Sequence, residues 1–490
     1  MTSTKSPKLL AITLLAALAV LAVPSTAPAS PSQLSLIQDD RELLGLSGQD
    51  PAASMAELKR LGVDVVRTNV IFHKIYNNPR QRKKPAGFNA SNPNDPRYDW
   101  GLTDRLVNLA RQNGIQVLMT ITGPPPHFAT EAPRRCRAVP CTFRPKPRDF
   151  GQFAAAAAKR YRGRVAYYSI WNEPNLNVWL TPQQKRPGGG RVQTEAAIYR
   201  KLWIAGYKSI AKNDPGRRNR VLFGETAAIG EPLSLFRAAL CLDESGKPFK
   251  GSLARKHGCS GRPAKLNIGG FAIHPYNFGG YGTPRSRVNR STALPIAYVP
   301  RIHKVINIAA RRGRITRRAP VFVTEFGFQT KPPDRFGRSL AEQAQFINES
   351  DRLFYGDRRV AMVAQYELSD VPERDQFNSG LRFTESKGRG MKPAYDAYRL
   401  PLVVTRRSAR SVEVYGQVRP GLSNTVQLQS SKGGAFAAVR SVKTNGRGFF
   451  RITVRGSGAA AKRYRLSWID AGTAFTSRVA RAGKPLRYRR

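Results

Sequence analysis

Residues 165–174 read VAYYSIWNEP, a run of strand-forming residues that ends in a polar pair. The first part has the β-branched and aromatic content of a buried strand. Asn172 and Glu173 follow it, although a strand that served only packing would need neither an amide nor a carboxylate there. In barrels of parallel strands, the carboxyl ends of the strands form the active site. The stretch therefore predicts a barrel strand with a functional glutamate at its end.

Runs of the same kind recur from about residue 41 to residue 400, separated by amphipathic helical segments. Besides 165–171, the expected strands are 43–46, 63–72, 115–122, 221–224, 268–274, 320–326 and 360–368. The expected helices include 51–61, 99–113, 148–161, 194–213 and 339–355. Eight strands that alternate with helices predict an α/β fold, a (β/α)8 TIM barrel. A doubly wound open sheet is the alternative, but it normally has a glycine-rich turn after its first strand, and none follows 43–46.

The sequence changes character after residue 400. Short alternating runs at 411–418, 425–429, 436–441, 448–454, 463–468 and 476–480 are separated by turn residues, which is typical of a small all-β sandwich. A chain of 490 residues is long enough for two domains. We therefore expect the barrel at 30–400 and the sandwich at 401–490.

The first 29 residues are typical of a secretory signal peptide. Two lysines precede an apolar run at 9–23, and an Ala-Pro-Ala pattern follows at 27–29. Fifteen apolar residues are short for a membrane span, which needs about 20. An uncleaved anchor is the alternative. No later segment has 18 consecutive apolar residues, so we expect a secreted, extracellular protein without a membrane segment after cleavage.

Secretion permits disulfides, and four cysteines allow three pairings. Near neighbours give the simplest pairing, which joins Cys136 to Cys141 and Cys241 to Cys259. A zinc site is less favoured because the chain has neither a Cys-x-x-Cys pattern nor paired histidines.

The chain is strongly basic, with 82 Lys and Arg against 32 Asp and Glu, a net charge of +50. The segment 401–490 holds 19 Lys and Arg against two acidic residues, so the charge is spread over both domains. Such a field favours anionic surfaces, for example a cell wall or an extracellular polymer. A merely solvated basic surface is the alternative. Specific nucleic-acid binding is disfavoured because no recognition helix or stacking motif is present.

A second glutamate ends another expected strand. Residues 324–327 read TEFG and close the apolar run 321–323, so Glu325 lies 152 residues after Glu173. If these are the fourth and seventh strands, the two carboxylates lie across the barrel mouth from each other. Paired carboxylates in that setting suit the hydrolysis of glycosidic bonds.

With these motifs the sequence resembles glycoside hydrolase clan A, which includes families 5 and 39, over residues 40–400. The resemblance is carried by VVRTN at 65–69, WNEP at 171–174, HPY at 274–276, TEFG at 324–327, and the stretch from SGL at 379–381 to KPAY at 392–395. It implies a secreted retaining β-glycosidase whose carboxyl groups lie roughly 5–5.5 Å apart. The substrate is then a β-linked oligo- or polysaccharide. Neither a metal nor an organic cofactor is implied.

The resemblance also assigns roles. Glu173 would be the general acid/base, which needs a raised pKa, and Glu325 would be the nucleophile. Arg67 and Tyr276 would hold the nucleophile carboxylate. Asn172 would bind the sugar 2-hydroxyl, and His274 matches a substrate-site histidine.

One departure from the clan concerns the floor of the sugar site. Many members carry a tryptophan at the end of the eighth strand, where this chain has Tyr366 as a substitute. Further candidates for substrate binding or support are His127, Trp171 and Trp179. Glu225 and Glu367 also end strands, and both are interpreted as rim or structural residues.

Two other functions stay open at this point. A non-catalytic barrel that binds carbohydrate or cell wall would explain the basic surface and the missing tryptophan. A transglycosylase would use the same two glutamates, so the sequence does not separate it from a hydrolase.

Overall fold

A computed structural model of the chain describes residues 30–184, 192–277, 282–371, 377–384 and 390–489. The expected signal peptide at 1–29 lies outside these residues. None of the helices in the described ranges is long and apolar enough to cross a membrane.

Eight parallel strands form a closed barrel in the order of the sequence, which confirms the predicted fold class. The strands are β1 (Leu34–Gln38), β2 (Val65–Ile71), β3 (Gln116–Thr122), β4 (Tyr167–Ile170), β5 (Val221–Ala227), β6 (Gly270–His274), β7 (Val321–Val323) and β8 (Val360–Tyr366). β1 pairs with both β2 and β8, so the sheet has no free edge.

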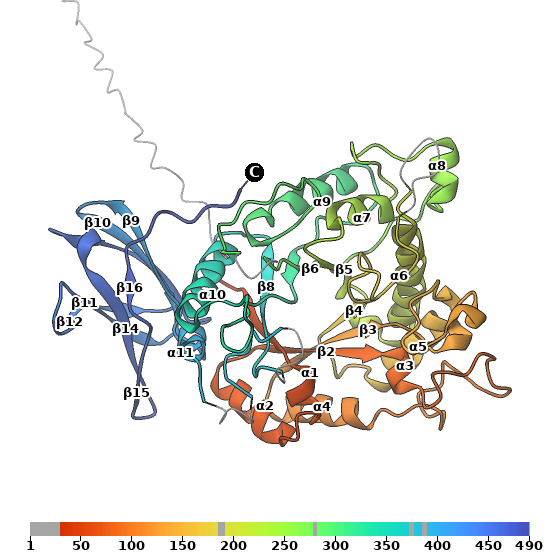
Figure 1. The fold of residues 1–490 in the computed structure, drawn as a ribbon, viewed down its shortest axis with the longest axis horizontal. Coiled ribbons are helices and arrows are strands. Elements are labelled where there is room, and N and C mark those ends of the chain that lie inside the picture. Colours follow the sequence, from red (N-terminus) through yellow and green to blue (C-terminus); the bar gives the residue numbers. More distant parts are fainter. Residues whose placement is uncertain (1–29, 185–191, 278–281, 372–376, 385–389, 490) are drawn as a thin grey trace, which may run out of the picture.

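The helices surround the barrel (Figure 1). They are α1 (Asp40–Leu43), α2 (Pro51–Arg60), α3 (Phe72–Ile75), α4 (Gly101–Gln112), α5 (Pro147–Arg160), α6 (Thr194–Asn213), α7 (Pro232–Ala239), α8 (Gly251–Lys256), α9 (Arg301–Arg311), α10 (Leu340–Tyr355) and α11 (Pro393–Arg399). Their apolar faces and the outward side chains of the strands form one large core, and a smaller cluster fills the barrel interior.

The first predicted strand, 43–46, is wrong. Residues 34–38 form β1 instead, and Leu43 ends the short helix α1. The Asp39 side chain accepts a hydrogen bond from the backbone N–H of Glu42 and so caps this helix. The apolar residues at 43–46 belong to the helix and to the turn after it, whereas the alternating sequence LSLIQ forms the strand.

The C-terminal part is a sandwich of two antiparallel sheets, as predicted. One sheet has the order β13 (Phe449–Arg455), β10 (Ser411–Gln417), β9 (Leu402–Ser408). The other has the order β12 (Ala437–Lys443), β11 (Thr425–Ser431), β14 (Arg463–Asp470), β15 (Thr473–Thr476), and β16 (Ala480–Arg481) also pairs with β14. Buried side chains of both sheets, such as Val414 and Leu466, share one core. Strand β9 was missed because its first four residues are buried and its last three are exposed, so buried and exposed residues do not alternate.

The sandwich packs against one side of the barrel, beside α10 and α11 (Figure 1). Tyr355 at the end of α10 contacts Tyr415 and Phe449, with ring centroids 5.0 and 4.8 Å apart. Arg352 of α10 donates to Glu413 at 2.8 Å, and Arg447 pairs with Asp64 at 2.5 Å. Aromatic packing and ion pairs therefore join the two parts.

The segment after β16 returns to the barrel. Leu486 and Tyr488 pack against the barrel core, and the backbone N–H of Arg489 donates to the carbonyl of Ala297 at 2.7 Å. The Arg489 guanidinium donates to the carbonyl of Arg285. This C-terminal strap, residues 482–489, holds the sandwich to the barrel at a second place.

Both expected disulfides are formed. Cys136–Cys141 closes a small loop after β3, and Cys241–Cys259 joins the end of α7 to the segment after α8. Each bond therefore restrains one long loop of the barrel.

Candidate active site

Alternation along the strands places a polar layer above the apolar barrel interior. In a strand, residues two apart face the same way. On several strands, an apolar residue inside the barrel is followed two positions later by a polar residue at the carboxyl end of the strand. These polar residues are Arg67 after Val65, Thr120 after Leu118, His274 after Ala272, and Thr324 after Phe322. The site is therefore built by the same alternation that builds the barrel core.

Arg67 is the centre of this layer and has no solvent exposure. Its guanidinium donates to Glu325 at 2.5 Å, to Asn172 at 2.7 Å and to Thr120 at 3.1 Å, and it lies 3.3 Å from Glu225. Burial disfavours the charged guanidinium, but Glu225 and Glu325 outweigh this effect and raise the pKa of Arg67. Arg67 therefore stays cationic and fixes the two carboxylates and the amide.

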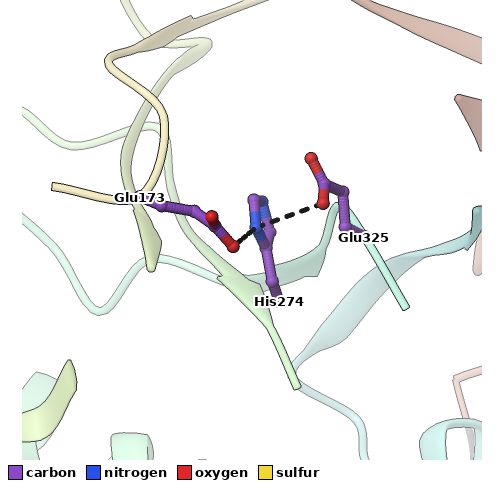
Figure 2. A group of neighbouring side chains, drawn as sticks. All are labelled: Glu173, His274 and Glu325. Carbon is purple, nitrogen blue, oxygen red and sulfur yellow. Dashed lines mark hydrogen bonds and ion pairs between the residues drawn. The ribbon is translucent and has the colours of Figure 1, made fainter. Parts of the chain in front are cut away.

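His274 lies between the two glutamates that the sequence singles out (Figure 2). Its Nδ1 is 2.9 Å from Glu173 Oε1 and 3.5 Å from Glu325 Oε2, and its Nε2 is 2.8 Å from Glu225 Oε2. Burial lowers the pKa of a histidine, but the three carboxylates dominate and raise the pKa of His274 to about 9. The carboxylates therefore favour protonation of the ring.

Glu225 lies at the centre of the site, whereas the sequence indicates a rim or structural residue. It is fully buried, and its carboxylate accepts hydrogen bonds from Thr120 at 3.3 Å, from Thr324, and from His274. Burial opposes ionisation, but Arg67 and His274 prevail and lower the pKa of Glu225 from 4.5 to about 2. The signal in the sequence is a glutamate at the end of an otherwise apolar strand.

Glu173 and Glu325 are the two glutamates that keep some solvent exposure, with 15% and 11% of their side chains accessible. One carboxylate oxygen of each and a ring nitrogen of His274 all lie within 4.8 Å of one another. Burial raises the pKa of Glu325, while His274 and Arg67 oppose that shift. Tyr276 also donates its hydroxyl to Glu325 at 3.3 Å.

Three residues at the ends of β4 and β5 have a strained backbone. Trp171, Glu173 and Glu225 have φ values of 69°, 39° and 52°, which non-glycine residues seldom adopt. The backbone N–H of Glu173 donates to the Glu225 carbonyl at 2.8 Å. Such strain is often stored at functional sites, where it orients reacting groups.

Three aromatic rings line the site beside Glu325. Tyr276, Tyr366 and Phe377 lie with ring centroids 5.8–6.4 Å apart. Burial strongly raises the pKa of Tyr276, so its hydroxyl stays protonated as a donor. Tyr366 thus has the position expected from the sequence, and Phe377, which comes from a loop with no strand signal, was missed.

Two of the other predicted residues are buried, and the third lies in the segment after β4. Trp171 is fully buried and packs against Phe150, with ring centroids 5.4 Å apart, so it supports the loop and contacts no solvent. His127 is buried under the Cys136–Cys141 loop, with Nε2 3.1 Å from the Ala138 carbonyl. Trp179 is half-buried in the segment after β4.

A metal is poorly suited to this group of side chains. Glu173, His274 and Glu325 have the spacing of a three-ligand site, but both ring nitrogens of His274 already face carboxylates. A metal bound at Nδ1 would have to displace the contact between this nitrogen and Glu173. The chemistry that the donor set favours is proton transfer and attack by a carboxylate.

No protein-family model and no curated protein matches the sequence. The structure is similar to that of a family 39 glycoside hydrolase from the gut symbiont Bacteroides cellulosilyticus WH2, with a TM-score of 0.51 and 15% identity over 87% of this chain and 80% of that chain. It is also similar to a glucosidase from Croceicoccus marinus, with a TM-score of 0.51 and 10% identity over 92% of this chain and 97% of that chain. At these identities the likeness shows the fold alone, so this chain shares the barrel architecture of these two proteins.

Proposed function

We propose that the protein is a retaining β-glycosidase that hydrolyses a β-linked oligo- or polysaccharide. The observation that carries the proposal is the pair Glu173 and Glu325, with one carboxylate oxygen of each within 4.8 Å of the other at the barrel mouth. Retaining enzymes place their carboxyl groups about 5–5.5 Å apart, whereas inverting enzymes leave room for a water at about 6.5–9.5 Å. The spacing supports a double displacement.

In the first displacement, the Glu325 carboxylate attacks the anomeric carbon while Glu173 gives its proton to the leaving oxygen. In the second, water attacks the glycosyl–Glu325 ester, Glu173 takes a proton from that water, and Glu325 is released. Arg67 and Tyr276 hold the Glu325 carboxylate for in-line attack. Asn172 accepts from Arg67 through Oδ1, which leaves its NH2 group to donate to a sugar hydroxyl.

The aromatic rings support a sugar ligand. Tyr276, Tyr366 and Phe377 provide apolar faces next to Glu325, and sugar rings pack on such faces through their C–H groups. This wall takes the place of the tryptophan that many clan members carry. Such a wall would serve a glycosidase and a non-catalytic carbohydrate-binding barrel alike, so turnover has to separate the two.

We further propose that the protein acts outside the cell and that the sandwich holds it on an anionic wall or extracellular polymer. Two disulfides favour an oxidising compartment. The sandwich carries exposed cations such as Arg440, Lys443 and Arg455, and few acidic residues balance them. Opposite charge would attract an anionic polymer without a deep pocket.

The test is hydrolysis of a panel of aryl β-glycosides and β-glucans by wild type, Glu325→Ala and Glu244→Ala. Glu244 is an exposed glutamate, so its variant is the matched control. We expect turnover by wild type and the control, and a loss of about 10⁴-fold or more in Glu325→Ala. Unchanged turnover in Glu325→Ala would contradict the proposal, and polymer binding without turnover would favour the non-catalytic barrel.

Two further measurements test the mechanism. An activated 2-fluoro glycoside of the best sugar should form a covalent adduct on the peptide that contains Glu325, detected by mass spectrometry. Product analysis at high acceptor concentration separates a hydrolase from a transglycosylase, because both would form the same adduct. An adduct on any other residue would contradict the nucleophile assignment.

A further inference from the structure

Glu225 has no role in the two-glutamate mechanism, yet it is one of the most enclosed carboxylates of the site. Thr120 and Thr324 donate to it, Arg67 lies 3.3 Å away, and His274 Nε2 lies 2.8 Å away. Each partner comes from a different part of the barrel. Arg67 belongs to β2, Thr120 to β3 and His274 to β6, and Thr324 directly follows β7. A buried charge with this many donors is costly to break and is held rigidly.

The arrangement fixes where the protons of His274 lie. An ionised carboxylate only accepts hydrogen bonds, and Arg67 together with two hydroxyl donors keeps Glu225 ionised. The contact of 2.8 Å therefore requires a proton on Nε2. A second partner of a histidine sets its tautomer in this way in metal sites and catalytic triads. Nδ1 is then the nitrogen that gains or loses a proton.

Nδ1 faces the reacting groups. It is 2.9 Å from Glu173 Oε1, within hydrogen-bonding distance, and 3.5 Å from Glu325 Oε2. Three carboxylates surround the ring: Glu173 from the segment after β4, Glu225 from β5 and Glu325 from the segment after β7. Arg67 of β2 pairs with Glu225 and Glu325. Figure 2 shows the imidazole between the carboxylates of Glu173 and Glu325.

We propose that Glu225 is a positioning residue that fixes the Nε2–H form of His274, so that Nδ1 and Glu173 together hold the proton that is given to the leaving group. This inference rests on the proposed glycosidase function. In the active form, the pair has one proton, either as Glu173–OH with a neutral imidazole or as a carboxylate with an imidazolium. That proton passes to the leaving oxygen, and the water that attacks in the second displacement returns one to the pair.

The pH profile should report this sharing. The alkaline limb of kcat/KM would then follow loss of the shared proton, a property of the pair and not of Glu173 alone. Removal of the anion beside Nε2 disfavours the imidazolium, so Glu225→Gln should move the alkaline limb to lower pH by about one unit or more. Glu225→Asp retains the anion and should restore much of the shift. Thr324→Val removes a hydrogen bond from Glu225 without a change of charge, and should leave the limb near its wild-type position.

A direct readout does not need activity. The chain has five histidines, so ¹⁵N-histidine spectra are tractable, and the spectrum of a His274→Gln variant assigns the His274 signals. In wild type, Nε2 should stay protonated across the titration while Nδ1 changes. The Glu173→Gln variant should shift the Nδ1 titration, whereas Trp179→Phe, in the same segment, should not.

The outcomes separate this inference from the proposed function. A titration at Nε2, or an alkaline limb that is the same in Glu225→Gln and wild type, would overturn the inference while hydrolysis and the Glu325 adduct still support the glycosidase. Absence of hydrolysis would overturn the proposed function, and the wild-type spectrum would still decide the tautomer. Because that spectrum needs no variant, a folding defect in Glu225→Gln leaves the inference testable.

Discussion

Charged side chains are buried and paired at the barrel mouth, whereas many are exposed to solvent in the C-terminal sandwich. At the mouth, Arg67, Glu225 and His274 have no side-chain exposure, and each contacts at least two oppositely charged groups. In the sandwich, cations such as Arg440 and Lys443 lie in solvent. The net charge of +50 thus describes the surface, whereas the proposed chemistry depends on a few enclosed acids. A basic composition does not predict the charge of a site.

Among the variants that compare the two regions, loss of the acid/base at the mouth should have the largest effect. Glu173→Ala should lower kcat/KM by about 10²–10⁴-fold for substrates with poor leaving groups, and by far less for activated aryl glycosides, because these need little protonation. The measurement is kcat/KM against leaving-group pKa for both proteins. Parallel losses across the series would mean that Glu173 is not the acid.

The second test compares an enclosed cation with an exposed one. Arg67→Met removes one of the two cations that face the buried Glu225 and Glu325, the other being His274, and should lower the free energy of unfolding by about 3–5 kcal/mol. Arg440→Met makes the same exchange at the surface of β12 and should change it by less than about 0.5 kcal/mol. Chemical denaturation measures both. If both variants lost a similar amount of unfolding free energy, the enclosed cation would contribute no more to stability than the exposed one, contrary to the prediction.

The pH dependence of stability should differ between the regions. The pKa of Glu225 is about 2 in the folded state against 4.5 ordinarily, so its contribution is present above pH 4.5 and is lost as the pH falls toward 2. This amounts to roughly 3 kcal/mol, and the stability advantage of wild type over Glu225→Gln should shrink by about that amount between pH 5 and 2.

Glu413 of the sandwich provides the comparison for this titration. Burial opposes its ionisation, but Arg352 and Arg407 lower its pKa, and it is less enclosed than Glu225. The advantage of wild type over Glu413→Gln should therefore shrink in the same direction by a smaller amount. Thermal melts followed by circular dichroism at pH 7, 5, 4 and 2.5 measure both differences. An equal or larger change for Glu413 would contradict the prediction.

The smallest effect concerns the sandwich surface. On the outer face of its larger sheet, Arg463 and Arg465 lie over Phe436, with guanidinium carbons 5.6 and 4.4 Å from the ring centroid. Arg463→Ser with Arg465→Ser should weaken binding to an anionic polysaccharide by about tenfold, as expected for two surface charges. Arg451→Ser with Arg455→Ser on β13 is the control of equal charge. Equal losses in a salt-dependent pull-down would mean that total charge, and not this face, binds the polymer.

The sequence predicts the barrel better than it predicts the contacts across its mouth. Seven of the expected strands lie within a few residues of those in the structure, because alternation and strand-end polarity are local features. The sequence indicates only a rim or structural role for Glu225, because its decisive partners, Arg67 and His274, come from other strands. Phe377 was missed for the same reason, since a loop residue acquires its neighbours only in the folded chain.

The C-terminal strap fixes how the two regions can act together. Because Arg489 bonds to Ala297 and Arg285 of the barrel, and Tyr355 packs into the sandwich, the sandwich is not a module on a flexible tether. If a polymer is held on the sandwich, the linkage that reaches the barrel mouth would lie at a fixed distance along the polymer from the bound part. The effective concentration would then be high for bonds at that spacing and close to zero for all others. An anchored enzyme of this kind would release fragments of preferred length, set by its own rigid geometry.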